Sequence, residues 1–280
     1  MSTQPPTRTL NDGHTLPAIG FGTYPLRGEE GIAAMTGALE VGYRMLDSAV
    51  NYENEEEVGK AWRRSGLPRE EVVLATKIPG RQHAYDEAVT SIEGSLRRMQ
   101  VDYLDLAFIH WPNPSVGLYR QAWQALVDVR ERGLVRSIGV SNFTEQFLSD
   151  VVTSTGVVPA VNQIELHPYF PQAGMRAVHE ELGIVTESWS PLGKASAPFA
   201  EEPVAAAAHA HGVSPAQAIL RWHVQLGAIP LPKSATRERQ ETNLDVFSFE
   251  LTDEEVSAIT GLARADGRLF DGDPNVHEEM

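Results

Sequence analysis

Four polar side chains in the first half of the chain stand where short apolar runs end, or just beyond. Asp47, Lys77 and His110 each follow such a run, and Tyr52 comes five residues after Asp47. A phenol has a pKa near 10 and is a poor acid at neutral pH. A nearby ammonium group favours the phenolate, which lowers that pKa and makes the tyrosine a better general acid. A Tyr–Lys pair of this kind predicts a site that protonates a carbonyl oxygen during its reduction.

The other two side chains fit the same chemistry. A buried ammonium needs a counter-ion, which Asp47 would provide for Lys77. His110 would donate a hydrogen bond to the substrate oxygen and orient it. Taken singly, Asp47 could cap a helix, Lys77 could lie on the surface and His110 could be structural. Four such groups at or just after successive strand ends favour a catalytic site.

The elements that position these side chains are short β-rich runs that alternate with amphipathic stretches. The strand candidates are Ala18–Thr23, Met45–Asp47, Val72–Lys77, Leu104–Ile109, Val135–Val140, Ala160–Gln163, Ile184–Ser188 and Ala228–Leu231. The helix candidates are Ile32–Glu40, Asn54–Ser65, Tyr85–Met99, Tyr119–Arg132, Glu145–Thr153, Ala173–Leu182 and Pro215–Gln225, the last with Ser214 as its N-cap. This alternation favours parallel strands joined by crossover helices.

Eight strand candidates predict a (β/α)8 barrel. The 280 residues divided among eight units give 35 residues per unit, a usual size for this fold. No linker divides the chain, so we expect one barrel domain over residues 1–280, with a tail at 265–280. The C-terminal strand ends of such a barrel open into one mouth, where the active site lies. The four polar side chains would converge there.

Two other nucleotide-binding folds share the alternation but lack support. A doubly wound sheet would carry Gly-x-Gly-x-x-Gly after its first strand. The nearest match begins at Gly20 and Gly22, and Pro25 replaces the third glycine, which removes the close helix–strand packing. The catalytic Tyr-x-x-x-Lys pair of short-chain dehydrogenases is absent from the sequence.

Composition excludes several function classes. With 23 basic and 38 acidic residues the net charge is −15, which argues against non-specific binding to nucleic acid or an anionic membrane. There is no cysteine, hence no disulfide, thiol nucleophile or thiolate metal site. The polar N-terminus does not resemble a secretory signal, and no apolar run is long enough to span a membrane. We therefore expect a cytoplasmic protein, and the scattered histidines predict no metal site.

A series of sequence blocks that match one family pattern runs in order through nearly the whole chain. The first matching blocks are Ala18-Ile19-Gly20-Phe21-Gly22-Thr23-Tyr24, Gly42-Tyr43-Arg44-Met45-Leu46-Asp47-Ser48-Ala49, Tyr52-Glu53-Asn54-Glu55, Leu74-Ala75-Thr76-Lys77 and His110-Trp111-Pro112. The later blocks are Ile138-Gly139-Val140-Ser141-Asn142-Phe143, Asn162-Gln163-Ile164-Glu165-Leu166-His167-Pro168, Ser190-Pro191-Leu192 and Pro232-Lys233-Ser234. This ordered series is specific, and by it the chain resembles the aldo-keto reductases. It looks most like the prokaryotic branch that includes the 2,5-diketo-D-gluconate reductases.

This resemblance implies a (β/α)8 barrel that reduces aldehydes or ketones to alcohols with NADPH. Asp47, Tyr52, Lys77 and His110 become the catalytic tetrad, with hydride from the nicotinamide and the proton from Tyr52. NADH is the alternative hydride donor, since Thr242-Asn243 stands where the family often has Glu-Asn.

The resemblance also implies the cofactor contacts. Ser141, Asn142 and Gln163 would bind the nicotinamide carboxamide, because an amide needs both donors and acceptors. Trp189 would stack on the nicotinamide ring. The positions matching cofactor-binding motifs elsewhere are Gly22, Thr23, Ser190, Leu192, Lys233, Ser234, Arg239 and Asn243. Lys233 and Arg239 would grip the 2′-phosphate, while Arg237 could assist or be solvated.

Tyr24 and Trp111 correspond to aromatic positions that line the substrate pocket. Asn51 could contact a polar substrate or face solvent, and the tail at 265–280 could fold over the pocket or fray. The acidic run around Glu55 is interpreted as a solvated helix start.

Three functions follow from these residues. The first is an NADPH-dependent reductase of small polar aldehydes or ketones, acting as a monomer. The second is an NADP(H)-binding sensor or regulatory barrel with negligible turnover, because fold and motif do not fix function. The third is a barrel lyase or isomerase that uses Tyr52 and Lys77 without nicotinamide.

Overall fold

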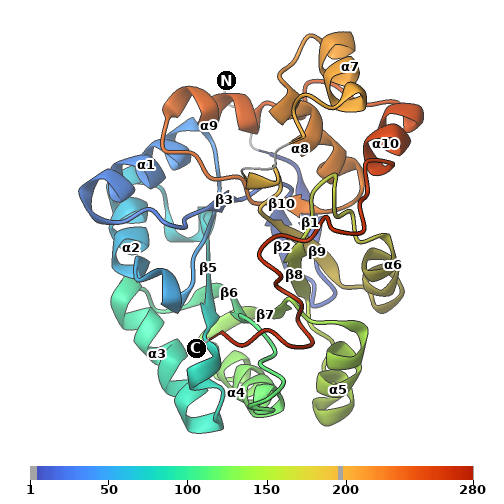
Figure 1. Ribbon diagram of the computed structural model, residues 1–280. Coiled ribbons are helices and arrows are strands. Elements are labelled where there is room, and N and C mark those ends of the chain that lie inside the picture. Colours follow the sequence, from blue (N-terminus) through green and yellow to red (C-terminus); the bar gives the residue numbers. More distant parts are fainter. Residues whose placement is uncertain (1–4, 195–197, 280) are drawn as a thin grey trace.

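Eight parallel strands form one sheet, in the order in which they occur along the chain (Figure 1). The computed structural model describes residues 5–194 and 198–279. The strands are β3 (Phe21–Gly22), β4 (Met45–Asp47), β5 (Val73–Ile78), β6 (Leu104–Ile109), β7 (Val135–Ser141), β8 (Val161–Glu165), β9 (Val185–Trp189) and β10 (Ile229–Pro230). Their positions match the predicted runs, although the first and last are shorter than expected.

Two backbone hydrogen bonds join the edges of this sheet. Gly20 N–H donates to the Pro230 carbonyl and Gly22 N–H to the Pro232 carbonyl, both at 3.1 Å. Proline has no N–H to return such a bond, which explains why the strands on either side of this seam are short. The sheet therefore closes on itself, and the predicted (β/α)8 barrel is confirmed.

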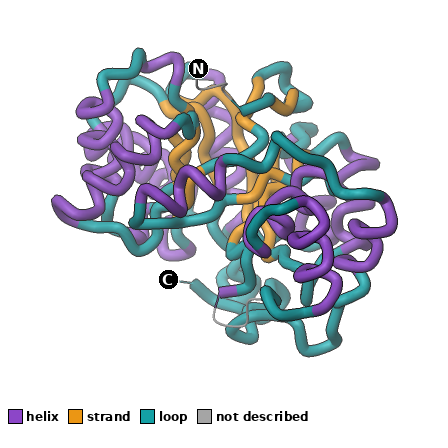
Figure 2. Tube along the Cα trace, turned by 90° about the horizontal axis from the view of Figure 1, so that it is seen from above, coloured by secondary structure: helices purple, strands orange, loops and turns teal. Residues whose placement is uncertain are grey.

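Helices surround the strands, which lie at the centre when the molecule is viewed from above (Figure 2). The predicted helices are present as α1 (Gly28–Val41), α2 (Glu55–Ser65), α3 (Tyr85–Met99), α4 (Tyr119–Glu131), α5 (Glu145–Thr155), α6 (Ala173–Leu182) and α8 (Pro215–Gln225). Ser214 caps α8 as predicted, and its side chain accepts a hydrogen bond from the Gln217 N–H.

Three further helices and a hairpin complete the described chain. The helices are α7 (Glu202–His211), α9 (Arg237–Leu244) and α10 (Asp253–Thr260), and the hairpin strands are β1 (Thr7–Thr9) and β2 (Thr15–Pro17). Helix α9 buries only Gln240 and Asn243, so its sequence carries no apolar period that would predict it. Short 3-10 turns cover η1 (Val50–Tyr52), η2 (Arg69–Glu71) and η3 (Gly80–Gln82).

The barrel interior is apolar away from the mouth. Met45, Leu106, Phe108 and Ile229 share one buried cluster with Leu16 of the hairpin. A larger cluster fills the space between the strands and the outer helices. Asp47, Lys77 and His110 lie at the other end, where β4, β5 and β6 terminate. Among the described helices, none is both long and apolar enough to cross a membrane.

Candidate active site

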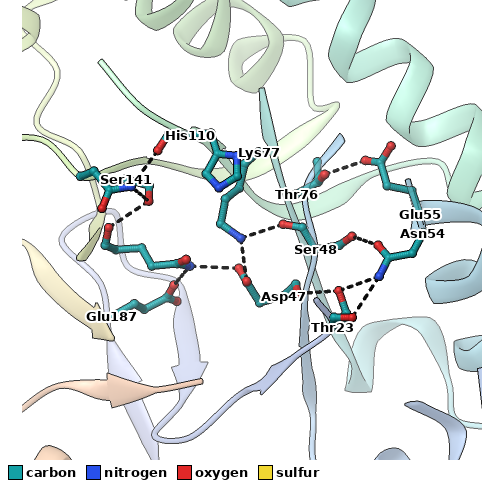
Figure 3. A network of polar contacts seen from close by, with 12 residues as sticks. Thr23, Asp47, Ser48, Asn54, Glu55, Thr76, Lys77, His110, Ser141 and Glu187 are labelled. Atoms are coloured by element: carbon teal, nitrogen blue, oxygen red, sulfur yellow. Dashed lines mark hydrogen bonds and ion pairs between the residues drawn. The ribbon is translucent and has the colours of Figure 1, made fainter. Parts of the chain in front are cut away.

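At the ends of β4 and β5, below the mouth of the barrel, a buried carboxylate and a buried ammonium group form an ion pair. Lys77 Nζ lies 2.6 Å from Asp47 Oδ2 and also donates to the Ser48 carbonyl at 2.8 Å (Figure 3). The Lys77 side chain is 0 % exposed and that of Asp47 is 5 % exposed. Burial acts to lower the pKa of Lys77, but the charge and hydrogen bond of Asp47 outweigh it and raise that pKa. The ammonium therefore stays charged.

Tyr52 and His110 lie on the cleft side of this ion pair. The Lys77 ammonium is 5.0 Å from the centre of the Tyr52 ring, and the His110 ring meets the Tyr52 ring edge-on at 5.7 Å. Burial raises the pKa of Tyr52 above its ordinary value, although Lys77 acts to lower it. The ammonium thus works in the predicted direction but does not outweigh burial. All four predicted tetrad residues are brought together.

A buried carboxyl that the sequence reasoning missed lies beside this network. Gln163 Nε2 donates both to Asp47 Oδ1 at 3.0 Å and to Glu187 Oε2 at 2.9 Å. Burial, reinforced by the charge of Asp47, raises the pKa of Glu187 to about 8. Its sequence signal is a carboxylate within a buried strand, two residues before Trp189 and on the same face.

Further polar contacts hold the tetrad from the side of α2. Thr23 Oγ1 donates to the Asp47 carbonyl at 2.9 Å, and Asn54 Nδ2 donates to the Thr23 carbonyl at 3.1 Å. Glu55 accepts a 2.6 Å hydrogen bond from Thr76 and pairs with Arg98. Because Glu55 is only 2 % exposed, its interpretation as part of a solvated helix start was wrong. The carboxylate is a buried acceptor that joins α2 to β5.

The three residues predicted to contact the carboxamide form one hydrogen-bonded group. Ser141 Oγ donates to the Gln163 carbonyl at 2.9 Å. Asn142 Nδ2 donates to the His110 carbonyl at 3.1 Å, and its Oδ1 accepts from Trp189 Nε1 at 2.7 Å. The indole is therefore fixed beside the amide, and the group links β7, β8 and β9 at the mouth.

A cleft of about 1000 Å³ opens above these groups. The predicted residues on its wall are Gly22, Thr23, Tyr24, Asp47, Tyr52, His110, Trp111, Asn142, Gln163, Trp189, Ser190, Leu192, Lys233 and Arg239. Four others are buried behind it: Lys77, Ser141, Ser234 and Asn243. Tyr24 packs its ring 5.1 Å from that of Tyr52, and Trp111 lies 6.4 Å from Trp189, so aromatic faces flank the opening.

Cations at the β10 end of the cleft differ in their pairing. Arg237 forms ion pairs with Glu40 at 3.1 Å and Glu241 at 3.0 Å. Lys233 and Arg239 are exposed, and neither forms an ion pair within the described part of the chain. Of the three, those two are the cations available to an anionic ligand.

These residues fit a phosphorylated dinucleotide. An indole, a neutral amide group and two uncommitted cations occur along one cleft, and these donors suit a nicotinamide ring, its carboxamide and a phosphate. Over the described residues, no group of three or more histidines and carboxylates is arranged to hold a metal ion.

The tail lies against the mouth, crossing in front of the barrel towards β5 and β6 (Figure 1). The His277 ring lies 4.1 Å from that of Trp111, and Glu279 Oε1 lies 2.8 Å from His110 Nδ1. The Leu269 N–H donates to the buried carboxylate of Glu165 at 2.6 Å. Of the predicted tail at 265–280, Met280 lies outside the described residues.

Comparison with known proteins decides the family. The model of the Aldo/keto reductase family matches residues 18–264. The chain belongs to the aldo/keto reductase family. This aldo/keto reductase is 59 % identical over 275 residues to the 2,5-diketo-D-gluconic acid reductase B of Corynebacterium sp. (strain SHS752001), covering 98 % of this chain and 99 % of the relative. The family and this named reductase identify it as an oxidoreductase.

Solved structures agree with the assignment. The apo crystal structure of Gox0644 matches the aldo/keto reductase described here with a TM-score of 0.94 and 41 % identity, over 99 % of this chain and 100 % of the other. The Bombyx mori aldo-keto reductase in complex with NADP matches with a TM-score of 0.87 and 35 % identity, over 93 % and 94 % of the two chains. The predicted family resemblance is confirmed.

Proposed function

We propose that this oxidoreductase reduces aldehydes and ketones to alcohols with NADPH, acting on small polar carbonyl compounds. The observation that carries the proposal is the buried Lys77–Asp47 ion pair, 2.6 Å long, set against the ring of Tyr52 at the floor of the cleft. A buried ammonium next to a phenol favours proton transfer from the phenol, because it stabilises negative charge on the phenol oxygen as the proton leaves.

Each residue has a role in this reaction. Tyr52 holds the proton that passes to the carbonyl oxygen. Lys77 offsets the effect of burial on the Tyr52 pKa, and Asp47 keeps the ammonium charged. His110 donates a hydrogen bond that orients the carbonyl. Hydride is the chemistry that NADPH supplies when it is bound.

The residues proposed to hold the cofactor follow the cleft from floor to rim. Ser141, Asn142 and Gln163 would bind the carboxamide, and Trp189 would offer its face to the ring. Lys233 and Arg239 would bind the 2′-phosphate, because neither is committed to a carboxylate in the described chain. The remaining proposed contacts are Gly22, Thr23, Ser190, Leu192, Ser234 and Asn243.

Two related proteins support the proposal. The name of the Corynebacterium relative gives a diketo sugar acid as its substrate, and the Bombyx mori structure contains NADP. We further propose that the enzyme uses NADH as a weaker alternative and works as a cytoplasmic monomer, expectations that come from the sequence alone.

The test is consumption of NADPH, followed by absorbance, with a panel of aldehydes, ketones and diketones. Tyr52→Phe should retain cofactor binding and lower kcat roughly 100- to 10,000-fold, because the proton donor is removed. Binding of NADPH without turnover on any carbonyl compound would instead support the sensor function. A protein that does not bind NADPH would point to the lyase or isomerase.

A further inference from the structure

The C-terminal tail carries a carboxylate directly to a residue of the tetrad. Glu279 Oε1 lies 2.8 Å from His110 Nδ1 and accepts a 2.6 Å hydrogen bond from Asn51 Nδ2. The Glu279 side chain is 16 % exposed and that of His110 is 11 % exposed. His110 lies on the wall of the cleft, and Glu279 lies behind its ring, next to Asn51, which precedes Tyr52 in the sequence.

Several contacts outside the carboxylate fix the tail in this position. Asn113 Nδ2 donates to the Glu279 carbonyl at 2.5 Å, and the Ser115 N–H donates to Glu278 Oε1 at 2.7 Å. A Cβ atom on Gly80 would collide with both Asn113 and the Glu279 carbonyl, so only glycine leaves room for the tail there. These two hydrogen bonds and the space left by Gly80 thus hold Glu279 in a fixed position.

The Glu279 carboxylate is ionised at neutral pH. Burial acts to raise the pKa of Glu279, but the charge and hydrogen bond of His110, with hydrogen bonds from Asn51 and the Gly80 N–H, lower it below its ordinary value. The negative charge also reaches Tyr52, where it acts to raise the phenol pKa. A second anion bound in the cleft beside His110 would be repelled by this charge across the imidazole ring.

We propose that Glu279 is a specificity-determining residue, whose carboxylate beside His110 selects against carbonyl compounds that carry a carboxylate next to the reacting carbon. The inference rests on the proposed reductase function. Like charges a few ångströms apart in a partly buried site repel far more strongly than in water. Neutral or hydroxyl-bearing carbonyl compounds are unaffected by this repulsion. A carboxylate several carbons from the reacting carbonyl can lie farther from Glu279, and the repulsion weakens with that distance.

The test compares two substrates that differ mainly in charge, pyruvate and methyl pyruvate, with NADPH as donor. Glu279→Gln keeps the shape of the side chain and its hydrogen bonding but removes the charge. Removing the charge also affects His110 and Tyr52, which act on both substrates, so the readout is the ratio of the two kcat/KM values. We expect Glu279→Gln to raise the ratio of kcat/KM for pyruvate to that for methyl pyruvate roughly 10- to 100-fold. Glu278→Gln is the matched control, because it removes the same charge from the neighbouring tail residue, whose carboxylate binds the Ser115 N–H instead of His110, and it should leave the ratio unchanged.

A binding measurement makes the result independent of turnover. Acetate is titrated into the protein without NADPH, and the NMR signals of the His110 ring nitrogens are followed. Acetate should bind Glu279→Gln at least about tenfold more tightly than the wild type.

Three outcomes would contradict the proposal. Equal gains for pyruvate and methyl pyruvate would make Glu279 a steric obstacle only. Unchanged values for both substrates, or equal acetate affinity in wild type and variant, would remove its charge from the substrate site. A wild type that oxidises no NADPH with any carbonyl compound contradicts the reductase function instead, and the acetate titration then decides the role of Glu279 by itself.

Discussion

Two of the chain's four lysines differ in their environment at the same cleft, one buried behind its floor and one exposed on its wall. Lys77 is 0 % exposed and is held by Asp47 and the Ser48 carbonyl, whereas Lys233 is exposed and has no ion-pair partner in the described chain. A buried ammonium is stable only with its counter-ion in place, while an exposed one is satisfied by water. The charges of the proposed catalytic floor therefore compensate one another without a ligand, and the proposed phosphate end keeps an unpaired cation for one.

This difference separates two kinds of mutational effect. Changes at the floor should reduce both stability and turnover, because the charges there compensate one another. Changes at the phosphate end should alter ligand affinity and leave folding nearly unaffected.

The largest contrast should come from one substitution made at both lysines. Lys77→Met leaves the Asp47 carboxylate buried without its cation, which should lower the free energy of unfolding by about 3–5 kcal/mol and abolish measurable reduction. Lys233→Met should change the free energy of unfolding by less than about 0.5 kcal/mol and weaken NADPH binding. Chemical denaturation of the two variants gives the comparison, and equal losses of stability would contradict it.

Ionisation of Glu187 is expected to destabilise the fold, because this carboxyl is buried close to the charge of Asp47. The pKa of Glu187 is raised to about 8 from 4.5, so the folded protein binds one more proton than the unfolded chain between these values. Stability from this group is present at low pH and is lost as pH rises towards 8. Glu187→Gln removes the titration, and its free energy of unfolding relative to wild type should rise by about 3 kcal/mol between pH 5.5 and 8.

Denaturation at both pH values measures this change, and groups common to the two proteins cancel in the difference. Glu53→Gln, an exposed position close to the same cleft, is the control and should show no pH-dependent advantage. A pH-independent difference for Glu187→Gln would mean that Glu187 is ionised across the range.

The smallest effect is expected at the phosphate end. Arg239→Ala should weaken NADPH binding roughly 10- to 100-fold, the value of one or two charge-assisted hydrogen bonds, and change NADH binding less than about threefold. Arg237→Ala should affect neither cofactor, because its guanidinium is already paired with Glu40 and Glu241. Fluorescence titration with both cofactors measures these affinities. Equal losses for NADPH and NADH would remove the 2′-phosphate role of Arg239.

The tetrad and the barrel could be predicted from sequence because both rest on local patterns. Asp47, Lys77 and His110 each end an apolar run, and parallel strands bring such ends to one edge. Helix α9 has no apolar period to detect, since only two of its residues are buried and both are polar.

Other features depend on contacts between distant segments. Glu55 resembles its solvated neighbours in sequence, and only the packing of α2 against β5 buries it beneath Thr76. The contact of Glu279 with His110 joins positions 169 residues apart, and no spacing rule relates them. Glu187 could have been identified as a carboxylate inside a strand, but its partner Gln163 becomes apparent only in the folded sheet.

The barrel wall should open more easily at the seam between β3 and β10 than between its other neighbouring strands. Pro230 and Pro232 accept hydrogen bonds from Gly20 and Gly22 but have no N–H to donate in return. Local opening is easiest where backbone pairing is sparse, so this seam should be the first part of the wall to separate. The proposed cofactor contacts lie on both of its sides, Gly22 on one and Lys233 on the other. A bound dinucleotide would therefore contact both edges of this seam and hold them together. Cofactor binding would then stabilise the closed form of the barrel.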